Sequence, residues 1–215
     1  PTDTVKPSVL PTDKPSALPT DKPSALPTDT IKPSALPTGS FVPTISRELF
    51  INNSMVEIFG DDILYNASNH QQDALNWLLN NDMFPVRDSD AVLQRYALAV
   101  MYYAMGGSYW GDSCQFLDIH ESECDWICSN RREGVFCDSQ DRVREIILSY
   151  NNATGVIPKE ITFMPMLKTL HLSWNNLHGT IPSEIGNMAN LKELYFSFNS
   201  LSGSLPSELG SLSGL

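Results

Sequence analysis

The pattern of apolar positions divides the chain into three stretches, and the first has no apolar face. Residues 6–38 repeat an octad, KPSVLPTD followed by variants of KPSALPTD, with proline at nearly every fourth position. Because proline fixes φ and removes backbone donors, we expect residues 1–44 to be a disordered, extended stalk. The tract is also rich in Ser and Thr, which predicts O-glycosylation, with an undecorated linker as the alternative.

Residues 45–142 contain two segments with helical spacing. The first spans about residues 70–80, where four apolar residues recur with a helical period: Ala74, Leu75, Leu78 and Leu79. In the second, five residues share a face: Val92, Tyr96, Ala99, Val100 and Tyr103. Ser89 can cap this second helix, and Gly106-Gly107 can end it. The pattern therefore predicts a mainly helical region, although residues 45–66 give no clear assignment.

The remainder of the chain is periodic. Copies of 24 residues begin at Val143, Leu167 and Leu191, so the repeats span 143–166, 167–190 and 191–214, and Leu215 starts a fourth. In-register agreement over three copies indicates a solenoid, in which each turn covers the apolar side of its neighbour.

Each copy predicts a short strand followed by a structural asparagine. Leu170 and Leu172 alternate with His171, as in a strand with one buried face. Asn175 ends that strand, and its counterparts are Asn151 and Asn199. A buried amide both donates and accepts, so we expect these three residues to bridge backbone groups of adjacent turns.

The spelling LxxLxLxxNxLxGxIPxxIGxL resembles the plant-specific class of leucine-rich repeats, as in receptor-like proteins, receptor kinases and polygalacturonase-inhibiting proteins. The resemblance implies an α/β leucine-rich-repeat solenoid, right-handed, with short parallel β-strands on its concave face. Upstream, Cys124-Asp-Trp126 and Gly134-Val135-Phe136-Cys137 look like the CxW…GVxC motif of the helical, disulfide-containing N-terminal cap. Seven residues separate Trp126 from Gly134, where the family usually has one. The chain begins with Pro1, so we expect a fragment of such a protein.

The four cysteines lie within one window, residues 114–137, and admit three pairings. The resemblance favours Cys124 with Cys137, which leaves Cys114 with Cys128. A zinc site that includes His120 is the alternative, because Cys124-x3-Cys128 lies within the range of ligand spacings. No CxxC pair is present, and we expect disulfides, with no metal and no cofactor.

The strand face is the candidate binding surface. It carries three columns of residues, at 24-residue intervals: Ile147, His171 and Tyr195; Ser149, Ser173 and Ser197; Tyr150, Trp174 and Phe198. Parallel strands about 4.8 Å apart stack each column into a ridge. Exposed aromatic residues suit a peptide or a sugar ring. The alternative is that these rings only shield the asparagines.

The sequence also contains candidate glycosylation sites and four histidines. Asn52, Asn66 and Asn152 begin N-x-S/T triplets and are candidates for glycosylation in a secreted protein. No catalytic constellation is predicted from the four histidines, which are His70, His120, His171 and His178. Only His171 has a clear place on the strand face, and Ser173 next to it lacks an acid partner of the kind a catalytic motif requires. Glu145 and Glu193 lie two repeats apart, too far to act as a carboxylate pair. We therefore do not expect an enzyme.

The charge balance excludes some partners. The chain has 14 basic and 25 acidic side chains, a net charge of −11. Charges cancel in residues 1–40, so the excess falls on the globular part, which is a poor partner for nucleic acid or anionic membrane. The longest apolar stretch, residues 96–105, is shorter than the roughly 18 residues of a membrane span. Membrane attachment would need segments outside this chain.

These features together favour an extracellular or cell-surface recognition module. On the resemblance, it is a receptor-like protein or receptor ectodomain that binds a peptide, protein or glycan through the concave face. The alternatives are a structural or adhesive wall or matrix protein, an inhibitor of a secreted hydrolase, and a cytosolic scaffold, which predicts reduced cysteines.

Overall fold

The computed structural model describes residues 46–59 and 68–215. The expected stalk over residues 1–44 and the candidate glycosylation site Asn66 lie outside these ranges. Within them, the helices are too short or too polar to cross a membrane.

Three α-helices form the N-terminal region: α1 (Arg47–Phe59), α3 (Asn69–Asn80) and α4 (Ser89–Ala104). Ser68 caps α3 through a capping box with Gln71. The predicted cap of α4 is wrong by one residue. Asp88 has extended backbone angles and its carboxylate accepts from the Ala91 amide at 2.8 Å, so Asp88 is the cap and Ser89 already belongs to the helix.

Helix α1 occupies a segment that the hydrophobic pattern left unassigned. Its residues Ile51 and Met55, one turn apart, are fully buried. Arg47, at its start, donates to the Leu78 carbonyl oxygen at 2.7 Å and to the Asp82 carboxylate at 2.7 Å. The helix is therefore anchored to the end of α3 by one long polar side chain and by a short apolar stripe.

A buried charge lies at the centre of the helical region. The Arg95 side chain in α4 is fully buried, and its Nε and Nη2 donate to the two carboxylate oxygens of Asp82, each at 2.7 Å. Its Nη1 donates to Glu123 at 2.9 Å. Three rings surround the guanidinium at 4.9–5.2 Å: Trp77, Phe84 and Trp126. Opposite charges and aromatic faces together compensate for the loss of water around this cation.

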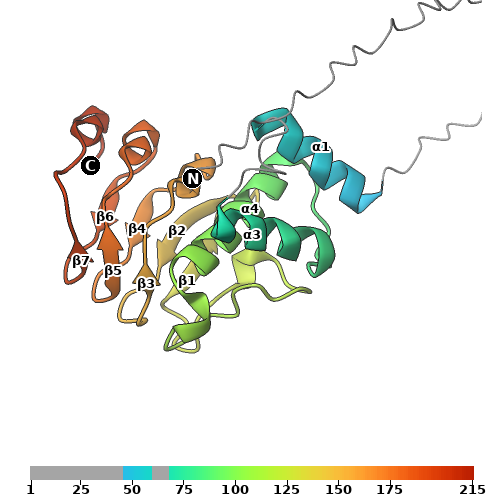
Figure 1. Ribbon diagram of the computed structural model, residues 1–215, viewed down its shortest axis with the longest axis horizontal. Helices are drawn as coiled ribbons and strands as arrows, with labels where there is room; N and C mark the ends of the chain where they lie inside the picture. The colour runs from blue at the N-terminus through green and yellow to red at the C-terminus, as the bar shows by residue number, and fades with distance from the viewer. Residues whose placement is uncertain (1–45, 60–67) are drawn as a thin grey trace, which may run out of the picture. The chain divides into compact units, whose positions relative to one another are not determined.

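The strands form two sheets, in which successive repeats lie side by side (Figure 1). The first has the order β1 (Gly134–Cys137), β2 (Val143–Ile147), β4 (Thr169–His171) and β6 (Glu193–Tyr195). Strand β1 is antiparallel to β2, and the other pairs are parallel. The parallel strands at 24-residue intervals confirm the predicted leucine-rich-repeat fold.

The second sheet was not predicted. It consists of β3 (Thr154–Gly155), β5 (Asn176–Gly179) and β7 (Ser200–Leu201), all parallel. Short 3-10 helices complete the turns: η3 (Lys159–Phe163), η4 (Ser183–Asn187) and η5 (Ser207–Ser211). Two others, η1 (Gly107–Tyr109) and η2 (Glu123–Asp125), lie in the helical region.

Burial of the repeat interior depends on the neighbouring turn. Leu148 and Leu172, at equivalent positions, are fully buried, whereas Phe196 in the last copy is only half-buried. Leu205 is 74% exposed, while its equivalent Ile181 is half-buried. Each copy therefore covers the apolar side of the copy before it.

Backbone hydrogen bonds join the end of α4 to the first repeat. The amides of Thr154 and Val156 donate to the carbonyl oxygens of Met105 and Ala104, at 3.0 and 3.2 Å. Between them, Gly155 has φ +90, and a Cβ there would lie 2.2 Å from the Ala104 oxygen. Only glycine allows this approach, so the end of helix α4 and the second sheet share one hydrogen-bonded edge.

Candidate functional site

Three exposed aromatic residues, Tyr150, Trp174 and Phe198, follow strands β2, β4 and β6, and we call them the aromatic ridge. Tyr150 and Trp174 stack with ring centroids 4.9 Å apart and planes inclined by 10°. Trp174 and Phe198 stack at 3.5 Å and 12°. Their exposed fractions are 69%, 42% and 64%. The ridge is thus a continuous apolar strip that faces solvent.

The backbone of the ridge is left-handed at every repeat, with φ of 51°, 60° and 57° at Tyr150, Trp174 and Phe198. This conformation costs an L-residue with a bulky side chain roughly 1–2 kcal/mol. Hydrogen bonds between turns hold it: the Tyr150 amide donates to the Ser173 oxygen at 3.2 Å, and the Trp174 amide to the Ser197 oxygen at 2.9 Å. The same unfavourable conformation therefore recurs at the equivalent position of all three copies.

The asparagine after each ring points inward. The Asn175 Oδ1 accepts from the backbone amides of Asn151 and Ala153, at 3.0 and 2.9 Å. Its Nδ2 donates to the carbonyl oxygens of Leu148 and Leu172, at 2.7 and 3.0 Å. The amide side chain therefore satisfies backbone groups of its own turn and of the preceding one.

The other two asparagines make related bonds with different partners. The Asn199 Nδ2 donates to the Leu172 oxygen at 2.8 Å, and its Oδ1 accepts from the Leu177 amide at 3.0 Å. The first copy has no repeat before it, and the Asn151 side chain instead accepts from the amide of Asp112 at 2.7 Å and donates to its carbonyl oxygen at 2.9 Å. The helical region thus supplies the partner that a preceding repeat would supply.

The strand face beside the ridge carries a second column of large side chains. Ile147 pairs in register with His171, and His171 with Tyr195. The His171 and Tyr195 rings lie 4.8 Å apart. The structure therefore places the predicted residues Ile147, Tyr150, His171, Trp174, Tyr195 and Phe198 in two neighbouring columns.

The serine column does not form the expected ridge. Ser149 and Ser173 are buried, and the Ser149 hydroxyl donates to the Glu133 carboxylate. Their short side chains do not reach solvent, so only Ser197, in the last copy, is exposed. The expectation that all three serines contribute to the surface is wrong for the first two.

A third column, which we call the acidic column because two of its three residues are acidic, lies on the other side of Ile147 and His171. Glu145, Thr169 and Glu193 pair in register, and the Thr169 hydroxyl donates to Glu193 at 3.3 Å. Sequence reasoning considered the two carboxylates only as a catalytic pair and missed their place on the strand face. The 24-residue interval that relates the residues of the aromatic ridge also relates positions 145, 169 and 193, so it could have identified this column.

Two disulfides brace the helical region, Cys114–Cys128 and Cys124–Cys137. This is the pairing that the family resemblance implied. The zinc alternative is wrong, because the four sulfur atoms are joined in two disulfides and none is a free thiolate that could bind zinc. His120 lies exposed on the surface.

The polar candidates outside the strand face lie apart from one another. Asn152 is exposed, its Nδ2 donates to the Tyr109 oxygen at 3.0 Å, and its Oδ1 accepts from the Asn176 side chain at 3.0 Å. Asn52 is half-buried within α1. His70 and His178 are exposed, in α3 and β5.

Comparisons with known proteins match the periodic part of the chain. Residues 166–188 and 190–212 match the family model Leucine Rich Repeat. A comparison with curated proteins found no relative. The second and third copies are therefore leucine-rich repeats, and the first copy pairs with them in the same register.

Solved structures similar to this chain include those of plant receptor kinases, two of which are leucine-rich-repeat ectodomains. That of GASSHO1/SCHENGEN3 from Arabidopsis thaliana, in complex with CASPARIAN STRIP INTEGRITY FACTOR 2, is 33% identical, with 44% of this chain and 12% of that chain covered and a TM-score of 0.38. SOBIR1 from Arabidopsis thaliana is 26% identical, with 57% of this chain and 62% of that chain covered and a TM-score of 0.42. The Arabidopsis receptor kinase HAESA, in complex with the peptide hormone IDA and the co-receptor SERK1, is 25% identical, with 59% of this chain and 24% of that chain covered and a TM-score of 0.37. The match spans less than two thirds of each of these chains.

Proposed function

We propose that this plant-type leucine-rich-repeat protein is an extracellular recognition module that binds a peptide or protein through the strand face of its solenoid. The observation that carries the proposal is the aromatic ridge, in which each repeat holds an exposed ring in a left-handed backbone conformation. The proposed contact residues are those of the two columns: Ile147, Tyr150, His171, Trp174, Tyr195 and Phe198.

The stacking of the ridge favours a peptide or protein over a glycan. A sugar ring binds best against the open face of an aromatic ring, and both faces of Trp174 are occupied by Tyr150 and Phe198. The central ring of the ridge therefore offers its edge to solvent, while Tyr150 and Phe198 are each stacked on one face. Ring edges pack well against apolar side chains, which are typical of peptide and protein partners.

The acidic column supports a partner with basic side chains. Glu145 and Glu193 lie on the strand face beside Ile147 and His171, and the whole chain carries a net charge of −11. Complementary charge speeds encounter and fixes the register of a bound chain more than it adds affinity. We infer that the partner combines apolar anchors for the ridge with a positive charge for this column.

The two disulfides support the extracellular location. Disulfides persist in oxidising compartments and are rare in the cytosol. Mass spectrometric mapping of the full chain after secretion from a eukaryotic host should recover both bonds. Four free thiols in protein from that host would contradict the proposed compartment.

Selection from a random peptide library tests the binding face. We expect peptides enriched on the full chain to contain aromatic or aliphatic residues near Lys or Arg. Their affinity should fall at least about tenfold for Trp174→Ala, because a central aromatic anchor typically carries 2 kcal/mol or more of binding energy. The control is His178→Ala, an exposed change in the second sheet. Peptides that bind the Trp174 variant as well as the original would place recognition elsewhere.

A further inference from the structure

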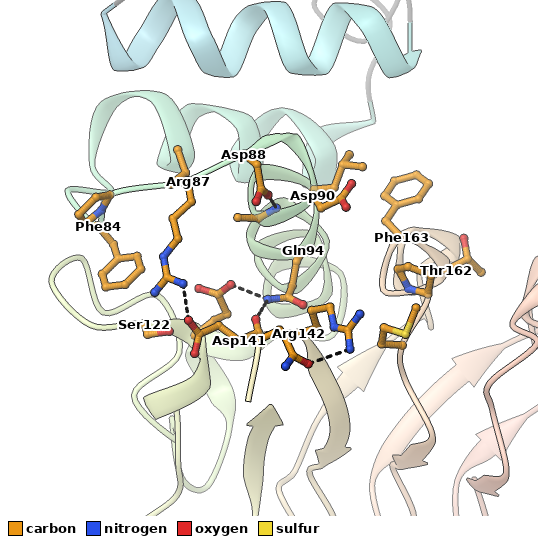
Figure 2. Close-up of a pocket in the computed structure, with 18 residues that line it drawn as sticks. Phe84, Arg87, Asp88, Asp90, Gln94, Ser122, Asp141, Arg142, Thr162 and Phe163 are labelled. Carbon is orange, nitrogen blue, oxygen red and sulfur yellow. Dashed lines mark hydrogen bonds and ion pairs between the residues drawn. The ribbon is translucent and has the colours of Figure 1, made fainter. Parts of the chain in front are cut away.

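A second candidate site lies at the opposite ends of the parallel strands. A pocket of about 530 Å³ opens between the start of α4, the turn that joins β1 to β2, and the chain that enters β4 (Figure 2). Its volume falls in the range of about 300–1,000 Å³ found for small-molecule sites. The pocket precedes the strands, whereas the aromatic ridge follows them, so the two sites are separate.

The walls of the pocket are mostly apolar. Phe84 and Phe163 stand on opposite sides of it, and Leu93 and Met166 contribute further apolar surface. These residues come from two stretches of the chain that are distant in the sequence, 84–94 and 162–166. Aromatic walls on two sides suit a flat or elongated apolar body that lies between them.

The floor of the pocket is already hydrogen-bonded. The Gln94 Nε2 donates to Glu123 at 2.7 Å and to the Asp141 carbonyl oxygen at 2.9 Å, and its Oε1 accepts from the Val143 amide at 2.7 Å. Because its amide is engaged on both atoms, Gln94 keeps its orientation without a ligand. The pocket is therefore preformed, which lowers the entropic cost of binding.

Ion pairs neutralise most of the charges around the pocket. Arg87 pairs with Asp141 at 2.6 Å, and Arg142 pairs with Asp138 at 2.7 Å. The buried Glu123 pairs with Arg95. Asp138 is shared with Arg144, which contacts it at 3.3 Å. The residues that line the pocket carry two guanidiniums, Arg87 and Arg142, and four carboxylates, Asp88, Asp90, Glu123 and Asp141.

Two carboxylates at the mouth remain uncompensated by any cation. Asp88 and Asp90 belong to the start of α4, and among residues 46–59 and 68–215 neither has an ion-pair partner. The α4 N-terminus offsets only part of this charge, since a helix end carries roughly half an elementary charge. The mouth is thus negative, above an apolar interior.

We propose that this pocket binds an apolar organic cation, with an aromatic or aliphatic body between Phe84 and Phe163 and its positive group toward Asp88 and Asp90. The positive group can belong to a free amine or to the basic side chain of a short peptide. An anion of the same shape meets two carboxylates at the mouth and is disfavoured. This site does not depend on the function proposed for the strand face.

Two probes of nearly equal shape and opposite charge test the inference on the full chain. Phenethylamine and 3-phenylpropionate share the same aromatic body, and Met166 provides a methyl reporter in the pocket. With 13C-methyl-labelled methionine, we expect phenethylamine to shift the Met166 signal and leave that of the buried Met101 unchanged. Phenethylamine should bind about three- to tenfold more tightly than the anion, as two exposed charge contacts allow. N-acetyl-Phe-Lys-amide, tested in parallel, distinguishes a peptide source from a free amine.

Variants locate the site and its charge preference. Asp88→Asn with Asp90→Asn keeps an amide that can still cap α4 and should abolish the preference for the cation. Ala91→Leu, which adds volume to the pocket wall, should weaken both probes at least about fivefold. Glu184→Gln, an exposed acid in η4, is the control and should change neither.

The proposal is overturned by any of three results. The first is a Met166 signal that none of the three probes shifts at millimolar concentration. The second is tighter binding of 3-phenylpropionate than of phenethylamine. The third is unchanged binding to a folded Ala91→Leu variant. If Ala91→Leu alters the urea midpoint, the test rests on the double asparagine variant alone. In that variant Asp90→Asn is an exposed change, and Asp88→Asn preserves the cap of α4.

Discussion

The helical region of residues 68–142 and the repeats of residues 143–215 satisfy their buried polar groups in opposite ways. In the repeats, one asparagine in each turn bonds to the backbone of its neighbours, so the same solution recurs every 24 residues. In the helical region, a single arginine collects two carboxylates and three aromatic rings. The partners of buried polar groups are thus spread over one asparagine in each turn of the repeats, whereas in the helical region they are concentrated around Arg95.

Mutations in the two regions should therefore differ in how far their effects extend through the structure. A defect in one repeat mainly affects its own interfaces, because each turn contacts only its neighbours. A defect at Arg95 affects several segments at once, since Asp82 follows α3 and Glu123 begins η2. The helical region also provides the first surface on which the repeats stack, through Ala104, Met105 and Asp112.

The largest effect is expected for Arg95→Met. This change leaves Asp82 and Glu123 buried with fewer or no positive partners, and it should cost about 3–5 kcal/mol. The matched control is Arg87→Met, because the Arg87–Asp141 pair is exposed at 71% and 50% and should contribute at most about 1 kcal/mol.

Urea unfolding of both variants measures this difference. Adding Asp82→Asn and Glu123→Gln to Arg95→Met should recover part of the loss, because it removes the unpaired charges. Similar midpoints for the two arginine variants would mean that polar satisfaction is not concentrated at Arg95.

A smaller effect is expected for Asn175→Leu. The leucine cannot accept from Asn151 and Ala153 or donate to Leu148, so buried backbone groups lose partners at about 1–3 kcal/mol. Asn176→Leu is the control in the adjacent position, where the side chain is exposed and bonds to Asn152. It should stay within about 0.5 kcal/mol. Equal shifts in urea midpoint would show that the amide of Asn175 is not what holds the turns together.

The same difference explains what could be predicted from the sequence. The parallel strands of the first sheet were predictable because their residues pair 24 positions apart, so assigning the strand in one copy assigns it in all three. The helical region has no such repetition. Nothing in the pattern around α4 distinguishes Arg95 as buried, and α1 has only a narrow apolar stripe at Ile51 and Met55. The second sheet was missed because its strands are two to four residues long and depend on backbone bonds.

The candidate site was partly predictable for a related reason. Columns such as Ile147, His171 and Tyr195 follow directly from the period. The left-handed backbone of the ridge does not, because bulky aromatic side chains disfavour positive φ. The pocket was not predicted, since it forms where Phe84 and Phe163, distant in the sequence, lie on opposite sides of one cavity.

Phe198→Asn tests whether the ridge stabilises the fold or serves another purpose. Asparagine adopts positive φ at lower cost, which should offset the lost stacking on Trp174, worth about 0.5–1.5 kcal/mol. We expect a net change within about 0.5 kcal/mol. Tyr195→Asn, in strand β6, has no such compensation and should cost about 1 kcal/mol through strand propensity and the lost contact with His171.

Thermal or urea unfolding compares the two variants. An equal loss for both would favour the reading in which the ridge only shields the asparagines, and would weaken the proposed binding face.

A further small effect is expected at Asp112, where the two regions meet. Its backbone bonds to the Asn151 side chain, and its carboxylate accepts from Ser129 and from the Cys114 amide. The hydrogen bonds, that from the Ser129 side chain foremost, lower the pKa of Asp112 below its usual value. A lowered pKa means that the charged form contributes stability above the unfolded-state pKa of about 3.9, and that this contribution is lost as the pH falls through the folded-state value.

Asp112→Asn removes this titration and retains a side chain of similar shape. The original chain should therefore be more stable than the variant at pH 6, by less than about 1 kcal/mol because the group is partly exposed. The gap should shrink at pH 3, below the unfolded-state pKa, because the carboxylate of the unfolded chain takes up a proton more readily there than that of the folded chain. Urea midpoints of both proteins at the two pH values measure the gap, and other carboxylates cancel in the difference. A gap that is equal at both values would mean that the junction depends on the shape of Asp112 and on its backbone bonds to Asn151, as the repeats depend on theirs, and not on its charge.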